Sequence, residues 1–242
     1  MAKKVKKEEN TMMYGVDDDL VLNTTARLPV CLCLDTSGSM TINSAIKALN
    51  EGVDALYEAI KSDELACNSC EISIVTFNSE VNVIEEFSTV DKKQQITLTA
   101  EGGSALAHGI NKSLDLLDRR KNKYKENGVD YYQPWLIVIT DGKPGDSEYI
   151  QEVQERTKIL LDDKKLTLFP IAVGMSRNKT KLKEVLDVLN GFCVTPRALH
   201  LKELNFNEFF EFIGKSVSAI SASAVGDKVK LDISNMSNWA EL

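Results

Sequence analysis

The chain has 242 residues and is 43% hydrophobic, which is enough to bury the core of one α/β domain. Its formal charge of −7 argues against a nucleic-acid partner, and no apolar run approaches membrane-spanning length. The one dense basic run, RRKNKYK, follows a predicted helix, where cations complement the helix dipole. We therefore expect a protein that binds neither nucleic acid nor membrane.

The start of the chain and the cysteines favour a cytoplasmic protein. The opening MAKKVKKEEN is basic, but no apolar stretch follows it as in a secretory signal. Five cysteines are an odd number, and several lie in or beside apolar segments, where cysteine behaves as a small hydrophobe. In CNSC, Cys67 and Cys70 have metal-ligand spacing, but no second Cys or His pair completes a zinc site nearby, so we expect a solvent-facing loop.

Residues 1–24 are polar and are expected to form a flexible N-terminal arm. The continuous apolar run at 28–34 predicts a strand that is buried on both faces, and apolar residues at helical spacing predict a helix over 42–60. Two alternating segments, 71–78 and 81–87, predict a hairpin. The remaining predicted elements are a helix over 106–117, a strand at 135–140, a helix over 147–161, a strand at 166–173, a helix over 182–189, a strand at 198–201 and a helix over 206–217.

This alternation of strands and helices predicts the fold class. Right-handed crossovers between successive strands give a mostly parallel sheet with helices on both faces. We expect a doubly wound three-layer α/β sandwich over residues 25–224, with about six strands and one antiparallel edge strand, followed by a C-terminal tail at 225–242. In such sheets the functional crevice lies beyond the carboxyl ends of the strands, where the strand order reverses.

Small oxygen-bearing side chains follow three of the predicted segments. The first strand ends in LDTSGSM with Asp35, Ser37 and Ser39, the run EGGSAL places Ser104 after two glycines, and VITDG places Asp141 after another buried strand. Because the carboxyl ends of parallel strands share one edge, these side chains are predicted to converge. Carboxylates and hydroxyls are hard ligands that suit Mg²⁺, with Mn²⁺ or Ca²⁺ as alternatives.

The order strand, DTSGSM, helix, GG(S/T) loop, strand, TDG resembles the von Willebrand factor type A (VWA) domain, which is Rossmann-like, and its metal-ion-dependent adhesion site. The resemblance implies that Asp35, Ser37 and Ser39 form the first ligand loop and that Asp141 acts through water. Ser104 stands where the family commonly has threonine and keeps the hydroxyl. The resemblance also implies that the ion binds a partner and does not catalyse a reaction. An Asp or Glu of the partner protein takes the remaining coordination position of the ion, so the site is a socket for that side chain.

The residues beside this socket are candidates for contact with the partner, namely Met40, Gly103, Lys143 and Pro144. The run RLPVCLCLDTSGSM and the short chain further resemble bacterial TerY-like proteins, which are associated with tellurium resistance and stress operons. That resemblance implies a stress-related function and an operon-encoded protein kinase or phosphatase as the partner.

The alternative is a Mg²⁺-dependent phosphohydrolase or phosphotransferase with Asp35 as the nucleophile. Enzymes of the haloacid dehalogenase type place a second acid two positions on, where this chain has Ser37, and a serine is no general acid near neutral pH. Neither a GxGxxG loop nor a Walker A motif is present. We therefore expect no enzyme activity. The chain has two histidines, His108 and His200, and His108 is expected to be a helix-surface or packed residue rather than a ligand.

Overall fold

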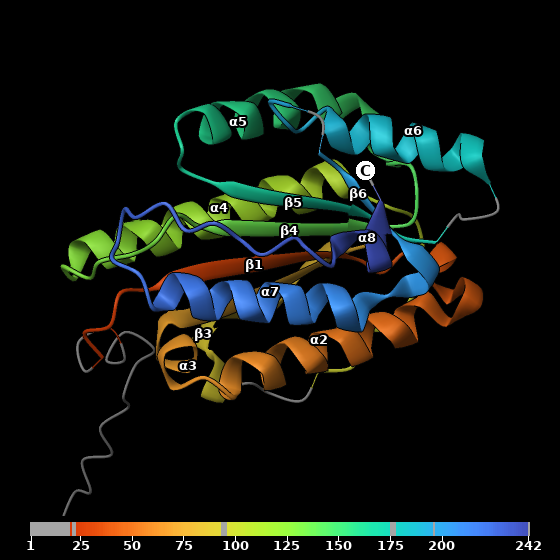
Figure 1. Ribbon diagram of the computed structural model, residues 1–242. Coiled ribbons are helices and arrows are strands. Elements are labelled where there is room, and N and C mark those ends of the chain that lie inside the picture. The colour runs from red at the N-terminus through yellow and green to blue at the C-terminus, as the bar shows by residue number, and fades with distance from the viewer. Residues whose placement is uncertain (1–19, 21–22, 93–95, 175–177, 196, 242) are drawn as a thin grey trace, which may run out of the picture.

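Figure 1 shows the computed structural model, which describes residues 20, 23–92, 96–174, 178–195 and 197–241. The expected N-terminal arm lies almost entirely outside these residues. Within the described chain, seven strands form one sheet with helices on both faces, which confirms the predicted doubly wound α/β sandwich. None of the helices described is both long and apolar enough to cross a membrane.

The sheet has the strand order β3-β2-β1-β4-β5-β6-β7. Strands β1, β2, β4, β5 and β6 are parallel, while β3 pairs with β2 and β7 pairs with β6 in antiparallel fashion. Every residue of β1 and β4 is buried, as their continuous apolar runs predicted. The strands are β1 (Leu28–Asp35), β2 (Cys70–Phe77), β3 (Val81–Thr89), β4 (Trp135–Thr140), β5 (Thr167–Ala172), β6 (Leu199–Leu201) and β7 (Ala240–Glu241).

Helices α2 and α7 cover one face of the sheet, and α4, α5 and α6 cover the other (Figure 1). Short turns of 3-10 helix connect several of the elements. The helical segments are η1 (Gly38–Ser44), α2 (Ala45–Lys61), α3 (Glu64–Ser69), η2 (Val90–Lys92), α4 (Leu106–Glu126), η3 (Ser147–Tyr149), α5 (Ile150–Asp162), α6 (Lys179–Asn190), η4 (Lys202–Leu204), α7 (Phe206–Ser221) and α8 (Met236–Trp239).

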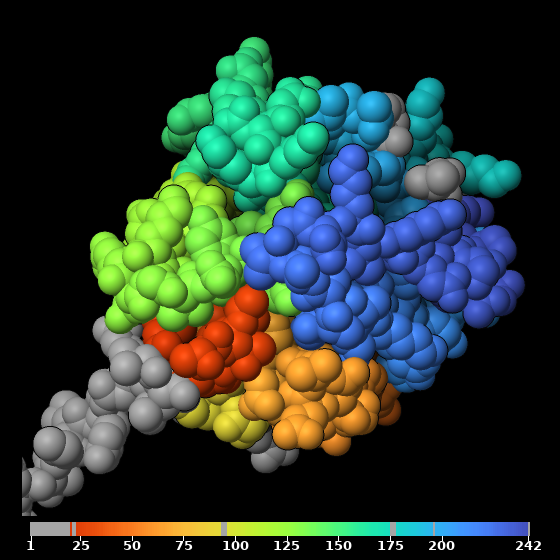
Figure 2. Space-filling view, turned by 60° about the vertical axis from the view of Figure 1, so that its left-hand side comes forward, coloured from red at the N-terminus to blue at the C-terminus, as the bar shows by residue number. Residues whose placement is uncertain are grey.

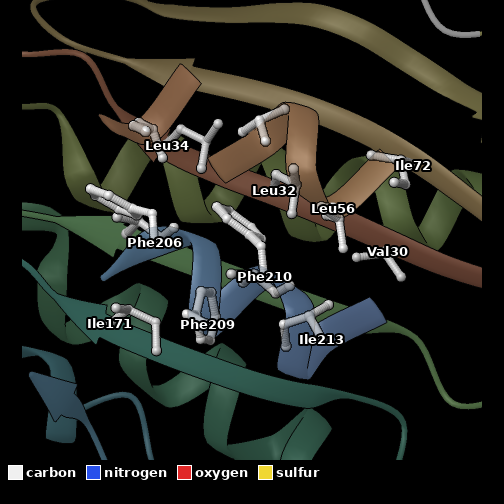
Figure 3. Packing of buried hydrophobic residues seen from close by; sticks show 14 of the residues in the cluster. Val30, Leu32, Leu34, Leu56, Ile72, Ile171, Phe206, Phe209, Phe210 and Ile213 are labelled. Carbon is white, nitrogen blue, oxygen red and sulfur yellow. The ribbon is translucent and has the colours of Figure 1, made fainter. Parts of the chain in front are cut away.

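Alternate residues of β1 enter the two halves of the core, because successive side chains of a strand point to opposite faces. Leu32 and Leu34 lie in the cluster that contains the phenylalanines of α7, and Figure 3 shows Phe206 and Phe210 facing this part of the sheet. Cys33 belongs to the cluster on the α4 side. Each fully buried side chain of this size stabilises the fold by about 1.5–3 kcal/mol. The packing of β1 on both faces therefore fixes the position of its last residue, Asp35.

The seventh strand was not predicted from the sequence. The indole of Trp239 packs against the rings of Phe209 and Phe212, with centroids 5.9 and 5.6 Å apart. This contact brings β7 beside β6, where His200 pairs with Glu241. A strand of two residues shows no periodicity, which is why the sequence did not predict it. The sheet therefore has an antiparallel strand at both edges, whereas one was predicted.

Candidate functional site

Three loops meet beyond the carboxyl ends of β1 and β4, at the point where the strand order reverses. The amide of Gly38, in the loop after β1, donates to the carbonyl of Gly102 at 3.0 Å. The amide of Gly145, in the loop after β4, donates to the carbonyl of Ser104 at 2.6 Å. The glycine loop before α4 is therefore bonded to both of the strand-end loops.

The five residues predicted to hold a metal lie in one network of hydrogen bonds. The hydroxyl of Ser104 donates to Asp35 Oδ2 at 3.3 Å, and the hydroxyls of Ser37 and Ser39 are 3.1 Å apart. Ser39 in turn donates to Asp141 Oδ1 at 2.5 Å. The fold thus brings together two carboxylates and three hydroxyls that are far apart in the sequence.

Asp35 is completely buried, with an exposed fraction of 0%. Its Oδ1 accepts from the amide of Ser37 at 2.8 Å, and its Oδ2 accepts from the hydroxyl of Thr140 at 2.5 Å. Burial raises the pKa of the Asp35 carboxyl and the charge of Asp141 adds to this, while the bonds from Ser37 and Thr140 act in the opposite direction. In the described chain these partners, like Ser104, are neutral, so no lysine or arginine compensates the buried carboxylate.

Thr140 is a residue of this site that the sequence analysis missed. Besides donating to Asp35, its hydroxyl accepts from the amide of Gly142 at 3.2 Å. It therefore holds the carboxylate and also shapes the turn that carries Asp141. Its position directly before that aspartate was the available signal, because the last residue of one parallel strand lies close to the last residue of its neighbour.

Asp146 was also missed. It is 7% exposed, and its carboxylate accepts from the amides of Ala107 at 3.2 Å and His108 at 2.9 Å, at the start of α4. It also lies 2.7 Å from Nδ1 of His108, whose half-exposed ring has the surface position expected for it. Asp146 thus caps α4 from a distant loop and ties the segment after β4 to that helix.

Of the four predicted contacts with a partner, the prediction for Met40 is wrong. Its side chain has an exposed fraction of 0% because η1 turns it back into the core beside α2. Gly103 is exposed, and its amide donates to the hydroxyl of Ser79 at 2.8 Å. Lys143 is exposed and forms an ion pair of 2.8 Å with Glu184, and the neighbouring Pro144 is half-buried. The last three lie on the loops that surround the site.

The CNSC segment does not form the expected solvent-facing loop. Cys67 lies half-buried on α3, and Cys70 is buried at the start of β2, where burial raises its thiol pKa. Within the described residues, no three His, Cys, Asp or Glu side chains group as metal ligands. His200 is buried, with Nε2 2.6 Å from the carbonyl of Gly174.

Residues 30–200 match the model of the von Willebrand factor type A domain. The chain belongs to this family. Domains of the VWA family are in general protein-interaction and adhesion modules and not enzymes, so the coarse function of this VWA domain is interaction with other proteins.

Several known proteins are similar to this VWA domain. Calcium-activated chloride channel regulator 1 of Sus scrofa is 25% identical over 171 residues, which are 67% of this chain and 16% of that protein. The pilus adhesin SpaC from Lactobacillus rhamnosus GG, in its open conformation, has a TM-score of 0.65 at 12% identity and covers 81% of this chain and 30% of its own. The chain therefore spans less than a third of either protein.

A third relative has nearly the size of this VWA domain. The vWF domain of the type V pili tip protein Mfa5 from Porphyromonas gingivalis has a TM-score of 0.56 at 10% identity and covers 85% of this chain and 99% of its own. At such low identities the likeness to solved structures shows the shared fold alone.

Proposed function

We propose that this VWA domain binds Mg²⁺ through Asp35, Ser37, Ser39, Ser104 and Asp141 and captures an acidic residue of a partner protein. The observation that carries the proposal is Asp35, a fully buried carboxylate whose hydrogen-bond partners are neutral. A buried charge without a compensating charge is costly. A cation on the outer side of this carboxylate would remove that cost.

The donor set fits such an ion. Carboxylate and hydroxyl oxygens are the hard ligands that Mg²⁺ prefers, and Mn²⁺ or Ca²⁺ would accept the same oxygens. When bound, the ion supplies a positive charge at the protein surface. Three of the five donors are neutral hydroxyls, and Asp141 is expected to act through water. Asp35 would then be the one carboxylate in direct contact with the ion, so an anionic ligand from a partner is favoured at the remaining position.

Each part of the site has its own role in this proposal. Asp35 supplies the innermost negative charge, and Thr140 fixes the orientation of its carboxylate. Ser37, Ser39 and Ser104 present hydroxyls from two different loops. Gly103, Lys143 and Pro144 lie on the surrounding loops, where a partner that supplies an Asp or Glu would contact them. Lys143 adds a positive charge on this face, although Glu184 partly compensates it.

The geometry favours this function over phosphoryl transfer. Phosphoryl transfer by Asp35 would need a general acid beside it, whereas the groups that hydrogen-bond to Asp35 in the described chain are hydroxyls and a backbone amide. Ser37, at the position of the general acid, is bonded through its amide to Asp35. The phosphohydrolase remains the alternative, and metal-dependent hydrolysis of phosphate esters by the purified domain would support it.

For the cellular setting we propose a bacterial stress or tellurium-resistance system in the cytoplasm, with an operon-encoded kinase or phosphatase as the partner. The resemblance to TerY-like proteins and the five free cysteines support this setting. The likeness to pilus proteins supports a cell-surface setting instead. Fractionation of the native host with an antibody to this chain separates the two.

Calorimetry with Mg²⁺ and Mn²⁺ tests the metal site directly. The wild-type domain is expected to bind one ion, and Asp35→Ala is expected to bind none. The matched control is Asp54→Ala, which removes an exposed carboxylate of α2 and should leave binding unchanged. Equal binding by wild type and Asp35→Ala would show that the site is assigned wrongly.

Capture of the partner tests the second half of the proposal. The wild-type domain, immobilised and exposed to host lysate, should retain the partner in Mg²⁺ and release it in EDTA. Asp35→Ala should retain nothing in either buffer. Retention that is insensitive to EDTA would mean that the interaction does not pass through the metal.

A further inference from the structure

A lysine-lined groove lies at the opposite end of the sheet from the proposed metal site, where α4, α5 and α7 end; Figure 2 shows this end of the molecule. It has a volume of about 840 Å³ and lies between the end of α4, the segment before β4, the turn between α5 and β5, and residues 225–231. Its charged lining residues are Lys121, Lys125, Lys164, Lys165, Lys228 and Asp227.

This local excess of positive charge contrasts with the formal charge of −7 of the whole chain. Three of the lysines, Lys125, Lys164 and Lys228, are exposed and form no ion pair with any residue that the structure describes. The single lining carboxylate, Asp227, accepts from the amide of Ala224 at 3.1 Å and so belongs to its own turn. The groove therefore has several positive charges to offer to an anionic ligand.

Two of the lysines are already partly compensated. Lys121 pairs with Asp118 at 2.7 Å, and Lys165 pairs with Asp163 at 2.8 Å. Both pairs join neighbours within one helix or turn, and Lys121 is partly buried whereas Lys165 is exposed. They leave the three unpaired lysines as the main source of charge in the groove.

The backbone at Lys164 supports a role for its side chain. Lys164 has a φ of 55° and follows the C-cap of α5, and its amide donates to the carbonyl of Leu161 at 3.0 Å. Helices that end in this way usually have glycine there, because a side chain is strained in the left-handed region. The chain carries a lysine at this position although glycine would relieve the strain.

The size of the groove and the spread of its lysines narrow the choice of ligand. Helices α4, α5 and α7 all finish at this groove, and the carbonyls of Lys125, Leu161 and Ile220 at their ends already accept hydrogen bonds within the chain. A compact phosphate would fill little of a groove of about 840 Å³. An extended peptide with acidic side chains can lie along the groove and supply a carboxylate to lysines from all three segments. The exposed side chain of Val225, at 46%, adds an apolar contact.

We propose that the lysine-lined groove docks an acidic segment of a partner protein, independently of the metal site at the other end of the sheet. The domain would then hold two proteins, or two parts of one protein, at opposite ends. Because the attraction is between exposed charges, it is expected to weaken as salt is raised from 50 to 500 mM.

The test uses a fluorescein-labelled hexaglutamate peptide, and binding is measured by fluorescence anisotropy in EDTA, so that no carboxylate binds through a metal ion. The triple variant Lys125→Gln, Lys164→Asn, Lys228→Gln is expected to bind at least tenfold more weakly than the wild type. The matched control replaces three exposed lysines on α2 and α7, as Lys47→Gln, Lys61→Gln, Lys215→Gln, and should bind like the wild type.

Three outcomes would overturn the proposal. One is the absence of peptide binding to the wild type at low salt, and another is an equal loss in the triple variant and in the control. The third is tighter binding of a labelled uridine hexamer than of hexaglutamate, which would point to nucleic acid. Both triple variants change the net charge equally, so a loss confined to the groove variant cannot arise from overall charge.

Substitutions at Lys164 separate peptide binding from stability. The charge of Lys164 is proposed to favour peptide binding, whereas its left-handed backbone lowers the stability of the fold. Lys164→Gly should raise the melting temperature by about 2 °C, because it relieves the left-handed strain, while it weakens peptide binding. Lys164→Arg should retain binding. Unchanged binding by Lys164→Gly, together with a raised melting temperature, would contradict the role of this lysine in docking.

Discussion

Two buried carboxylates at opposite ends of the sheet have different surroundings. Glu71, near the start of β2, has an exposed fraction of 1%, and its oxygens accept from Nε and Nη2 of Arg120 at 2.6 and 2.8 Å and from the hydroxyl of Tyr124 at 2.5 Å. Arg27 Nε lies 3.5 Å from the same carboxylate. Asp35, at the end of β1, is buried as deeply but has neutral hydroxyls and an amide around it.

The surroundings of the two carboxylates distinguish one that stabilises the fold from one that is suited to an external cation. Glu71 is compensated by guanidinium groups of the protein, so its charge is balanced when the chain folds. Asp35 has no such partner in the described chain, and burial raises its pKa. The protein tolerates the cost of this uncompensated buried carboxylate at the end of β1, where the three loops converge.

The largest effect is expected for Glu71→Gln. The substitution leaves two buried guanidinium groups without their carboxylate, and breaking a buried pair typically costs about 3–5 kcal/mol. The free energy of unfolding, measured in urea, should fall by that amount, whether or not Mg²⁺ is present. Glu101→Gln, at an exposed position, is the control. A loss below about 1 kcal/mol would mean that the ion pairs at Glu71 do not stabilise the fold.

The same exchange at the other end, Asp35→Asn, should have the opposite result without metal. A raised pKa means that the folded protein favours the neutral carboxyl. The amide oxygen of asparagine can still accept from the amide of Ser37, and its NH₂ group can donate to the hydroxyl oxygen of Thr140, so the metal-free melting temperature should be unchanged or higher. Mg²⁺ at 100 times its dissociation constant should stabilise the wild type by about 2.7 kcal/mol and leave Asp35→Asn unaffected. Strong destabilisation of the metal-free variant would remove the contrast with Glu71.

A third buried carboxylate, Asp146, is compensated by the amides at the start of α4 instead. Asp146→Ala should lose about 0.5–2 kcal/mol of stability, whereas Asp146→Asn should lose less, because the single oxygen of asparagine can still accept from one amide at the start of α4. Thermal melting in EDTA measures both variants. Equal losses in the two variants would mean that the charge, rather than the acceptor oxygen, stabilises the helix start.

The smallest effect is expected at Ser104. Ser104→Ala should weaken metal-dependent partner capture roughly three- to tenfold, corresponding to about 1 kcal/mol for one lost oxygen contact, and Ser104→Thr should retain it. The metal-free melting temperatures of both variants should match the wild type, because Ser104 forms no cap of α4 and its hydrogen bond to Asp35 is long, at 3.3 Å. An early melting Ser104→Ala protein with normal capture would make Ser104 a structural residue.

The site could be predicted to the extent that it depends on strand ends. Asp35, Ser37, Ser39, Ser104 and Asp141 were named because parallel strands bring their carboxyl ends to one edge, and the fold places them in one network. Their chemistry as ligands remains a proposal.

Hydrophobic periodicity and crossover handedness are local or topological properties, so the amino-acid pattern was enough to predict the α/β class, the buried strands and the convergence of the site loops. Only the tertiary structure decided that Met40 points into the core, that Asp146 caps a helix 39 residues away in the sequence, and that Trp239 adds a strand to the second edge. It also decided that lysines from α4, the α5–β5 turn and the C-terminal segment line one groove. Each of these depends on contacts between residues distant in the sequence, and no local pattern encodes such contacts.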